Sequence, residues 1–507
     1  MSRVALRLAI CIGVCVARPA YALSCGDLTR LALPATTITS AELVATGTFD
    51  TPRIESLPEF CRVRATLKPS SDSDIKIEVW LPAAGWNGKF QGVGNGGWAG
   101  AIDYTGLGDA VKAGYVGAST DTGHVGDTAS FAIGHPEKLI DMGYRAVHEM
   151  TVRGKSIAEA FYGAAPAASI FNGCSLGGRQ AVTEANRYPA DYDAIIAGAP
   201  SIYNMSVHAA RVALNAAAQR TPDSRIPGEK YAMVHDAVLD ACDALDGVED
   251  GVIDDPLQCT FDPQVLECRN GDGPSCLTPT QVETMRLLYS PIRTSSGELL
   301  SAPLLQPGTE LGWNTLAGRQ PVTTALEAFK YVVFNDPTWT VNRFNPSSDI
   351  SRALDADQGV LSLIDPNLAP YFSRGGKLML YHGWQDPQVP AQNTIRFFND
   401  VVKTMGPSVV SASIQLYMVP GMDHCGGGPG ASEFNSVRAM EEWLRTGSAP
   451  ARIVAAHATP EWTVDRTRPL CPFGQVAQWN GTGSADDAAN FACVADTSRT
   501  IQRAAQR

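Results

Sequence analysis

Residues 168–187 constrain the fold most strongly, because a β-rich run passes directly into a helical run through Gly173-Cys174-Ser175-Leu176-Gly177. A Gly-x-Ser-x-Gly pentapeptide between a strand and a helix is typical of the nucleophile elbow of α/β-hydrolases. The small residues at positions 173 and 177 permit a tight turn that holds the Ser175 hydroxyl clear of the backbone. Such a pentapeptide also arises by chance in long chains, so its surroundings have to support it.

The surrounding pattern predicts an α/β fold with a parallel sheet. β-rich and helical runs alternate along residues 74–200, and the alternation resumes over residues 377–445. The predicted strands are Asp74–Leu81, Lys89–Val93, Gly114–Ala118, Ala168–Asn172, Tyr192–Ala197, Lys377–His382 and Ser413–Val419. The predicted helices are His135–Tyr162, Gly178–Arg187, Pro390–Lys403 and Ala431–Arg445.

Residues 201–372 interrupt this alternation with four cysteines, many turn residues and helical patches at Pro227–Leu245 and Pro279–Leu288. We interpret them as a lid domain inserted over the carboxyl edge of the sheet, where open α/β sheets carry their sites. Residues 23–200 and 373–507 then form the catalytic domain. The expected fold class is therefore an α/β-hydrolase fold with a large inserted lid.

The first 22 residues predict a cleaved secretory signal peptide. Arg3 and Arg7 precede the apolar run 8–17, and Ala20-Tyr21-Ala22 supplies small residues for cleavage after Ala22. This apolar run is too short to span a bilayer. We therefore expect a secreted or periplasmic protein without a membrane anchor after cleavage.

Charge argues against nucleic acid as a partner. The formal net charge is −12, and loss of Arg3, Arg7 and Arg18 with the signal would change it from −12 to −15. A strongly acidic chain repels the phosphate backbone. We therefore do not expect nucleic acid among the partners of this protein.

The cysteine count predicts disulfides. Removing Cys11 and Cys15 with the signal leaves ten of the twelve cysteines, an even number in an exported chain. Zinc is a poor alternative, because no Cys-x-x-Cys pair occurs and no histidine is spaced as a ligand beside the cysteines.

A serine nucleophile needs a histidine base and an acid, which follow it in the order Ser, Asp or Glu, His in this fold. The predicted strand ending at His382 leads into a loop with Asp386, and the next predicted strand leads into a loop with His424. Of the eight histidines, only His424 has the strand, the loop and the chain order in its favour. We interpret His382 as a structural histidine at a strand end. Asp423 competes for the acid role, but an aspartate next to the base usually points elsewhere.

The predicted site also includes an oxyanion hole. The oxyanion needs backbone donors, for which we select Leu176 together with Gly96 or Gly97 from the glycine-rich run Gly92–Trp98. A phosphate-binding loop is a poorer explanation of that run, because no Gly-Lys-Ser/Thr follows.

Cys174 and Cys425 adjoin the proposed nucleophile and base. If Ser175 and His424 are hydrogen-bonded, a disulfide between these cysteines would join the two loops of the site. The alternative, two unrelated buried thiols, treats their matching positions as coincidence.

The segment Cys242–Val252 contains a candidate cation site. Asp243, Asp246 and Asp250 lie at intervals of three and four, with glycines that let carbonyl oxygens turn inward. Hard oxygen ligands suit Ca²⁺, although the spacing is not that of an EF-hand. A solvated acidic turn explains the same residues and is favoured when they are considered alone.

Four motifs together resemble the tannase and feruloyl esterase family over nearly the whole mature chain. They are Gly94-Asn-Gly-Gly-Trp98, Gly173-Cys-Ser-Leu-Gly-Gly-Arg179, His382-Gly-Trp-Gln-Asp386 and Asp423-His-Cys425. The resemblance implies a triad of Ser175, Asp386 and His424 beside a Cys174–Cys425 disulfide. It further implies the bridges Cys25–Cys61, Cys242–Cys259, Cys268–Cys276 and Cys471–Cys493.

The resemblance also reverses the preference at the acidic segment. It implies a structural Ca²⁺ bound by the side chains of Asp243, Asp246 and Asp250 and by the carbonyl oxygens of Val248 and Val252.

Members of this family cleave small aromatic esters: hydroxycinnamoyl esters of plant polysaccharide, galloyl esters of tannins and, in a few relatives, a terephthalate monoester. The resemblance implies a feruloyl esterase first, with a tannase or a mono(2-hydroxyethyl) terephthalate hydrolase as alternatives. Leu176 departs from the acidic residue that a terephthalate hydrolase carries beside its nucleophile. Phe334 and Trp339 are candidates for an aromatic substrate wall or for lid core.

Two alternatives from other classes stay open. The first is a non-catalytic, calcium-stabilised module that binds phenolics, against which the intact Ser175, Asp386 and His424 argue. The second is a peptidase, because a triad can also cleave amides.

Overall fold

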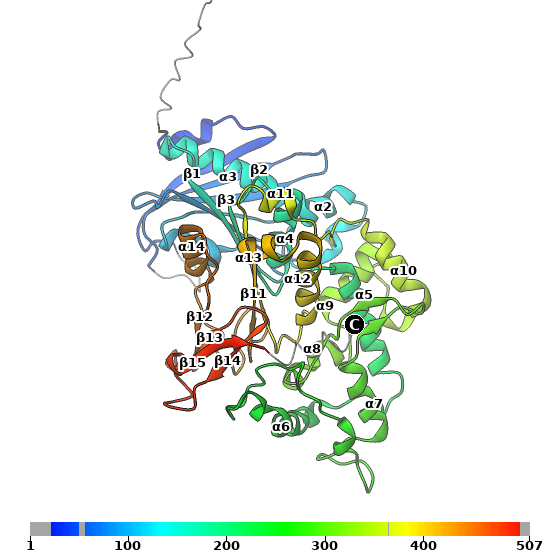
Figure 1. The fold of residues 1–507 in the computed structure, drawn as a ribbon. Helices are drawn as coiled ribbons and strands as arrows, with labels where there is room; N and C mark the ends of the chain where they lie inside the picture. The colour runs from blue at the N-terminus through cyan, green and yellow to red at the C-terminus, as the bar shows by residue number, and fades with distance from the viewer. Residues whose placement is uncertain (1–21, 50–55, 363–364, 497–507) are drawn as a thin grey trace, which may run out of the picture.

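The structure, a computed structural model, describes residues 22–49, 56–362 and 365–496, so the predicted signal lies outside it except for Ala22. Nine strands form one sheet in the order β1-β2-β3-β5-β4-β6-β7-β10-β11. They are β1 Thr36–Val44, β2 Phe60–Leu67, β3 Ile75–Pro82, β4 Lys89–Val93, β5 Val116–Thr120, β6 Ala168–Cys174, β7 Ala194–Gly198, β10 Lys377–Gly383 and β11 Ile414–Val419. Figure 1 labels β1, β2 and β3 near one edge of this sheet and β11 at the other edge.

The sheet is mixed. From β5 through β4, β6, β7 and β10 to β11, every neighbouring pair is parallel. β1, β2 and β3 pair antiparallel, and β3 is also antiparallel to β5. The prediction of parallel pairing was therefore wrong for Asp74–Leu81, which forms β3. The short connection from β2 to β3 allows only a hairpin, because a parallel pair needs a long crossover.

Both faces of the central strands are buried, which explains their apolar sequences. In β7, Ile195 and Ala197 pack in the core beneath α3, α4 and α12. Ala194 and Ile196 point the other way and pack with Met440 of α14. This alternation follows from the two-residue period of a strand.

The catalytic domain contains seven α-helices in the described residues. They are α1 Tyr104–Lys112, α2 Pro136–Ile140, α3 Ala146–Tyr162, α4 Leu176–Arg187, α12 Ala391–Met405, α13 Pro407–Ser413 and α14 Ser436–Thr446. The predicted helix His135–Tyr162 divides into α2, a π-helical turn at Asp141–Arg145 and α3.

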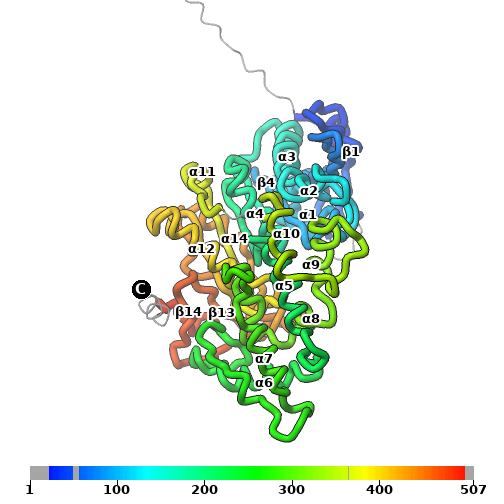
Figure 2. The backbone as a smooth tube through the Cα atoms, turned by 90° about the vertical axis from the view of Figure 1, so that its right-hand side faces the viewer, coloured from blue at the N-terminus to red at the C-terminus, as the bar shows by residue number. Residues whose placement is uncertain are grey.

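The lid segment connects β7 to β10 and has its own core. Its helices are α5 Asn204–Ala218, α6 Tyr231–Cys242, α7 Pro279–Leu288, α8 Asn314–Ala317, α9 Thr323–Glu327, α10 Pro346–Asp357 and α11 Ala369–Phe372, with a hairpin of β8 Ile292–Arg293 and β9 Leu299–Ser301. Figure 2 shows α5 beside α8, α9 and α10. Trp98 and Leu176 of the catalytic domain join the lid core, so the lid packs against the start of α4.

Two C-terminal hairpins were not predicted. They consist of β12 Ile453–Ala458 with β13 Val464–Leu470 and of β14 Gln475–Trp479 with β15 Phe491–Ala495. Their strands are short and half exposed, so they lack the apolar runs that indicate the central strands.

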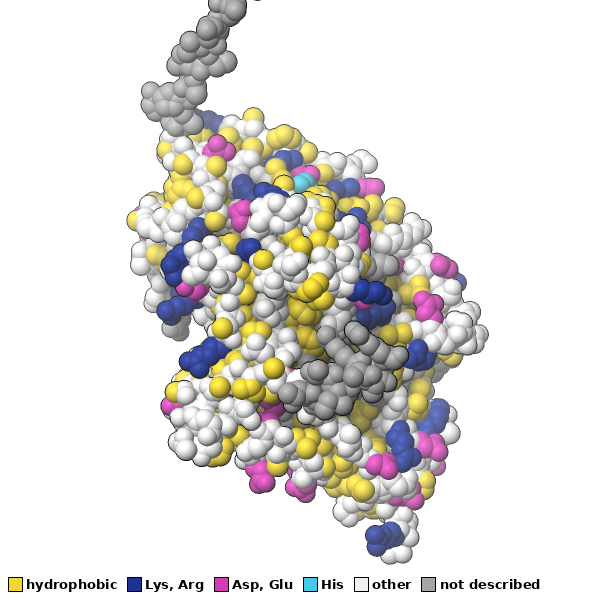
Figure 3. Space-filling model, viewed as in Figure 1, with side chains coloured by type: hydrophobic (Ala, Val, Ile, Leu, Met, Phe, Trp, Pro, Cys, Tyr) yellow, Lys and Arg dark blue, Asp and Glu magenta, His cyan; other side chains and the backbone are white. Residues whose placement is uncertain are grey.

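Basic and acidic side chains are interspersed on the face in Figure 3, as suits an acidic chain without one dominant charged patch there. Across the described ranges, no helix has the length and apolar character needed to span a bilayer.

Candidate active site

Ser175 occupies the sharp turn between β6 and α4. Its backbone has φ 63° and ψ −120°, a region that non-glycine residues rarely adopt. The turn needs glycine on either side, because a Cβ at Gly173 would lie 2.6 Å from the carbonyl carbon of Gly177. Strain of this kind is typical of functional sites, and here it presents the hydroxyl above the sheet edge.

The structure brings Ser175, His424 and Asp386 together from three loops. His424 Nδ1 lies 2.7 Å from Asp386 Oδ2, and His424 Nε2 lies 2.8 Å from Ser175 Oγ. Because the carboxylate can only accept, Nδ1 carries the proton and Nε2 is free to accept the serine proton. This is the hydrogen-bonded order that a nucleophilic serine requires.

Asp386 is buried and accepts four hydrogen bonds. Oδ1 accepts from the backbone N–H groups of Gln388 and Val389, at 2.7 and 2.9 Å. Oδ2 accepts from His424 and, at 3.1 Å, from His382. Burial alone would raise the pKa of Asp386, but the charge of His424 and the two imidazole hydrogen bonds hold it well below its usual range. The acid is therefore ionised and immobile.

His382 has a larger role than the sequence interpretation gave it. Its Nε2 faces two acceptors, Asp386 Oδ2 and the Val389 carbonyl oxygen, each at 3.1 Å, so Nε2 must carry a proton. Its Nδ1 then accepts from the Thr394 hydroxyl at 2.8 Å. The available signal was the spacing of four residues from Asp386 across the end of β10.

The hydrogen bonds of the His424 ring go to Asp386 and Ser175, and none in the described residues joins it to Asp423. The backbone N–H of Asp423 donates to the Gly427 carbonyl, and burial raises the pKa of its carboxyl, with a smaller contribution from the charge of Asp386. The preference for Asp386 over Asp423 as the acid agrees with this arrangement.

The five expected disulfides are all present. Cys174–Cys425 joins the residue before the nucleophile to the residue after the base, with Cα atoms 5.9 Å apart. The remaining bridges are Cys25–Cys61, Cys242–Cys259, Cys268–Cys276 and Cys471–Cys493. The Cys174–Cys425 bridge joins loops that lie 251 residues apart in the sequence, so it restricts how far Ser175 and His424 can separate.

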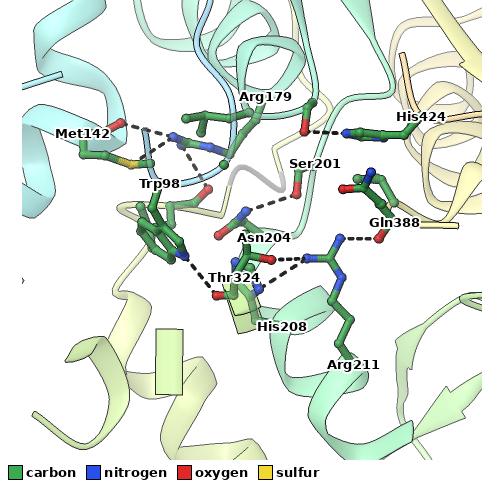
Figure 4. Close-up of a pocket in the computed structure, with 15 residues that line it drawn as sticks. Trp98, Met142, Arg179, Ser201, Asn204, His208, Arg211, Thr324, Gln388 and His424 are labelled. Carbon is green, nitrogen blue, oxygen red and sulfur yellow. Dashed lines mark hydrogen bonds between the residues drawn. The ribbon is translucent and has the colours of Figure 1, made fainter. Parts of the chain in front are cut away.

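A pocket opens beside Ser175 and His424 at the junction of the catalytic domain and the lid (Figure 4). Leu176 and Gly97, two of the predicted oxyanion donors, line this pocket. The N–H of Gly177 is already bonded to the Asn95 carbonyl at 2.7 Å, which ties the glycine-rich loop to the elbow. The oxyanion roles of Leu176, Gly96 and Gly97 stay predictions.

Phe334 and Trp339 lie in the lid core. Their rings stack with centroids 5.3 Å apart, and Trp339 is fully buried. The pocket is lined instead by Trp98, Met142 and Leu361, beside polar side chains from α5. The alternative that treated the two aromatics as lid core fits their positions.

The acidic loop at residues 243–252 folds back on itself behind the Cys242–Cys259 bridge. The Asp243 carboxylate accepts the N–H of Gly251 at 2.9 Å, and Asp246 accepts the N–H of Val248 at 3.0 Å. Burial raises the pKa of Asp246 to about 6, and the charges of Asp250 and Asp243 add to this shift.

Asp250, the third predicted ligand, forms ion pairs with Arg468 and Arg466 of β13. No three His, Cys, Asp or Glu side chains in the described part of the chain are already arranged to hold a metal ion. The loop nonetheless supplies the hard oxygen donors that Ca²⁺ prefers.

A buried acid, an imidazole and a strained serine above the carboxyl edge of an α/β sheet define a serine hydrolase of the α/β-hydrolase class. The family model for tannase and feruloyl esterase matches residues 61–494. The chain therefore belongs to the tannase and feruloyl esterase family, and it is a carboxylic ester hydrolase.

Individual relatives agree with this assignment. An uncharacterised esterase of Xanthomonas campestris pv. campestris is 38% identical, with 97% of this chain and 95% of the relative aligned. A probable feruloyl esterase B-2 of Aspergillus flavus is 34% identical over 82% of this chain and 84% of its own length. The crystal structure of feruloyl esterase B from Aspergillus oryzae superposes with a TM-score of 0.87 at 27% identity, covering 93% of this chain and 99% of the other.

Proposed function

We propose that this protein is a secreted feruloyl esterase that cleaves hydroxycinnamoyl esters, including those linked to plant polysaccharide. The observation that carries the proposal is the triad joined by Cys174–Cys425 beneath a lid pocket, whose mixed lining places Trp98 and Leu361 among polar side chains. Flat phenolic acyl groups suit such a lining. The relative named as a probable feruloyl esterase supports this choice of ester.

The geometry supports a two-step acyl transfer. His424 accepts the proton of Ser175 while Oγ attacks the ester carbonyl, and Asp386 stabilises the imidazolium. The N–H groups of Leu176 and Gly97, or Gly96, stabilise the oxyanion. His424 then protonates the leaving alcohol and later deprotonates the water that releases the aromatic acid.

A panel of esters tests the substrate assignment. We expect methyl ferulate to give the highest kcat/KM, roughly ten-fold above methyl gallate and mono(2-hydroxyethyl) terephthalate, because Leu176 makes the wall beside the nucleophile apolar. Steady-state hydrolysis by the purified protein measures this ranking.

Any other ranking of kcat/KM values would support one of the alternative functions. If methyl gallate has the highest kcat/KM, the protein is a tannase. If the terephthalate ester has the highest kcat/KM, the protein is a mono(2-hydroxyethyl) terephthalate hydrolase. A faster peptide amide assigns a peptidase. If nothing turns over with folded, oxidised, calcium-loaded protein, the phenolic-binding module replaces the esterase.

Export is part of the proposal. Five disulfides need an oxidising compartment to persist, which supports secretion or the periplasm over the cytosol. The arginines and apolar run of residues 1–22 support the same assignment.

A structural Ca²⁺ is the second part of the proposal. Asp243, Asp246 and Asp250 would bind it through carboxylates, and Val248 and Val252 through carbonyl oxygens. The ion would stabilise the fold of the loop closed by Cys242–Cys259 and would take no part in the chemistry.

Chelation is expected to lower the melting temperature by about 5 °C or more, because a ligand bound only to the folded state stabilises it by mass action. Calorimetry with and without a chelator measures the shift. Asp246→Asn should melt early in Ca²⁺ and respond little to the chelator. Asp240→Asn, a change at an exposed position on α6 outside the loop, serves as the matched control and should behave as wild type. Equal melting of wild type with and without chelator would exclude the site.

A further inference from the structure

Arg211 places a positive charge in the substrate pocket. It projects from α5 and lines the same pocket as Ser175 and His424. The residue is only 5% exposed, and its guanidinium lies between Thr324 and Gln388 (Figure 4). The mechanism of ester cleavage assigns no role to this side chain.

The hydrogen-bonding capacity of Arg211 is only partly used. One terminal nitrogen donates to the Gln388 carbonyl oxygen. The other reaches the Thr324 hydroxyl at 3.3 Å and His208 Nδ1 at 3.5 Å, which are long contacts. The buried Nε–H has no partner. A guanidinium has five N–H donors and these contacts involve three of them, so two stay available for a ligand.

The hydrogen bonds of Arg211 go to Gln388, Thr324 and His208, and no Asp or Glu in the described ranges forms an ion pair with it. Burial lowers the pKa of Arg211 to about 10, against the opposing charge of Asp386, so the group is still cationic at neutral pH. Burial, together with the charges of Arg211 and Arg179, lowers the pKa of neighbouring His208 well below its usual value, which keeps that imidazole neutral.

Arg179 provides a useful contrast in the same pocket. It is also buried, but its terminal nitrogens donate to the carbonyl oxygens of Met142, Gly143 and Leu361. Those contacts join the lid to the catalytic domain, which is a structural role. Arg211 has one backbone acceptor of this kind, the Gln388 carbonyl oxygen, so it contacts the catalytic domain through a single carbonyl group.

We infer that Arg211 binds an oxygen substituent on the aromatic ring of the acyl group, either a phenolic oxygen or a carboxylate. The ring itself would pack against Trp98 and Leu361, which line the pocket with Arg211. A buried cation without an ion pair at contact distance is unfavourable, so a substrate oxygen that accepts its free N–H groups gains binding energy. This inference rests on the proposed esterase function and adds a basis for its selectivity.

Two matched ester pairs test the inference: methyl 4-hydroxycinnamate against methyl cinnamate, and monomethyl terephthalate against methyl benzoate. Wild type should prefer the oxygen-bearing member of each pair, and Arg211→Met should reduce that preference in kcat/KM by roughly 10- to 100-fold. Arg211→Lys should retain part of the preference for the carboxylate, because it keeps the charge without the planar fork. Arg220→Met, at an exposed position just after α5, is the control and should leave both ratios unchanged.

Arg211 also contacts the loop that carries Asp386, so its replacement could disturb the triad as well as substrate binding. The ratio of kcat/KM values within each ester pair distinguishes these two effects. Equal losses for both members of a pair would show that Arg211 only positions that loop, and would overturn the inference. If Arg211→Met does not fold, the Lys variant and the wild-type ratio decide. Wild-type ratios near one contradict the inference while the esterase function stands, whereas no turnover of any ester contradicts the proposed function itself.

Discussion

Replacing Ser175 by alanine is expected to lower kcat for every ester by roughly 10⁴- to 10⁶-fold. The alanine keeps the elbow, the lid and the disulfides but has no oxygen to form the acyl-enzyme. His424 then has no proton to accept from position 175, where its Nε2 now lies 2.8 Å from Oγ. Single-turnover and steady-state assays with methyl ferulate measure the loss.

Ser201→Ala is the matched control for this experiment. Ser201 lines the same pocket, and its hydroxyl accepts a hydrogen bond from Asn204 at 3.1 Å, whereas His424 Nε2 is hydrogen-bonded to Ser175. We expect its kcat/KM to change less than ten-fold. Comparable residual activity in the two variants would mean that Ser175 is not the nucleophile.

Replacing Asp386 by asparagine is expected to lower kcat by about 10⁴-fold. The carboxylate accepts two imidazole N–H groups on one oxygen and two backbone N–H groups on the other. Asparagine replaces one of these oxygens by an NH₂ group, which can only donate. In either orientation of the amide, that group would face N–H donors instead of acceptors. His424 therefore loses the tautomer that accepts the Ser175 proton, or the loop at Gln388 and Val389 loses its bonds.

The same substitution changes stability with pH. The folded pKa of Asp386 is lowered, so its contribution to the free energy of unfolding is complete above the ordinary Asp pKa of about 3.9 and is lost as the pH falls below it. Asp386→Asn should remove this part of the acid sensitivity, which urea titrations at a series of pH values from about pH 5 downward would measure. Wild-type activity with unchanged acid sensitivity in the variant would contradict both roles of the carboxylate.

Local sequence patterns accounted for most of the central sheet. Lys89–Val93 was predicted with its observed bounds, and the strand ends near Ser175, Asp386 and His424 were predicted within a few residues. These segments are apolar on both faces and end in turn residues, so their signals are strong. Strands β1 and β2 and the C-terminal hairpins were not predicted, and β3 was predicted in a parallel sheet although it pairs antiparallel. Pairing direction depends on partner strands that can lie far away in the sequence.

The sequence by itself predicted Ser175, His424 and Asp386 as nucleophile, base and acid, because each follows a strand in a characteristic turn and the chain order is that of the α/β-hydrolase fold, and the structure places the three within hydrogen-bond distance. Only the tertiary structure decided that His382 bonds to Asp386, that Phe334 and Trp339 lie in the lid core, and that Arg211 enters the pocket. Such contacts join segments that no local period relates, since they depend on how the lid packs against the sheet.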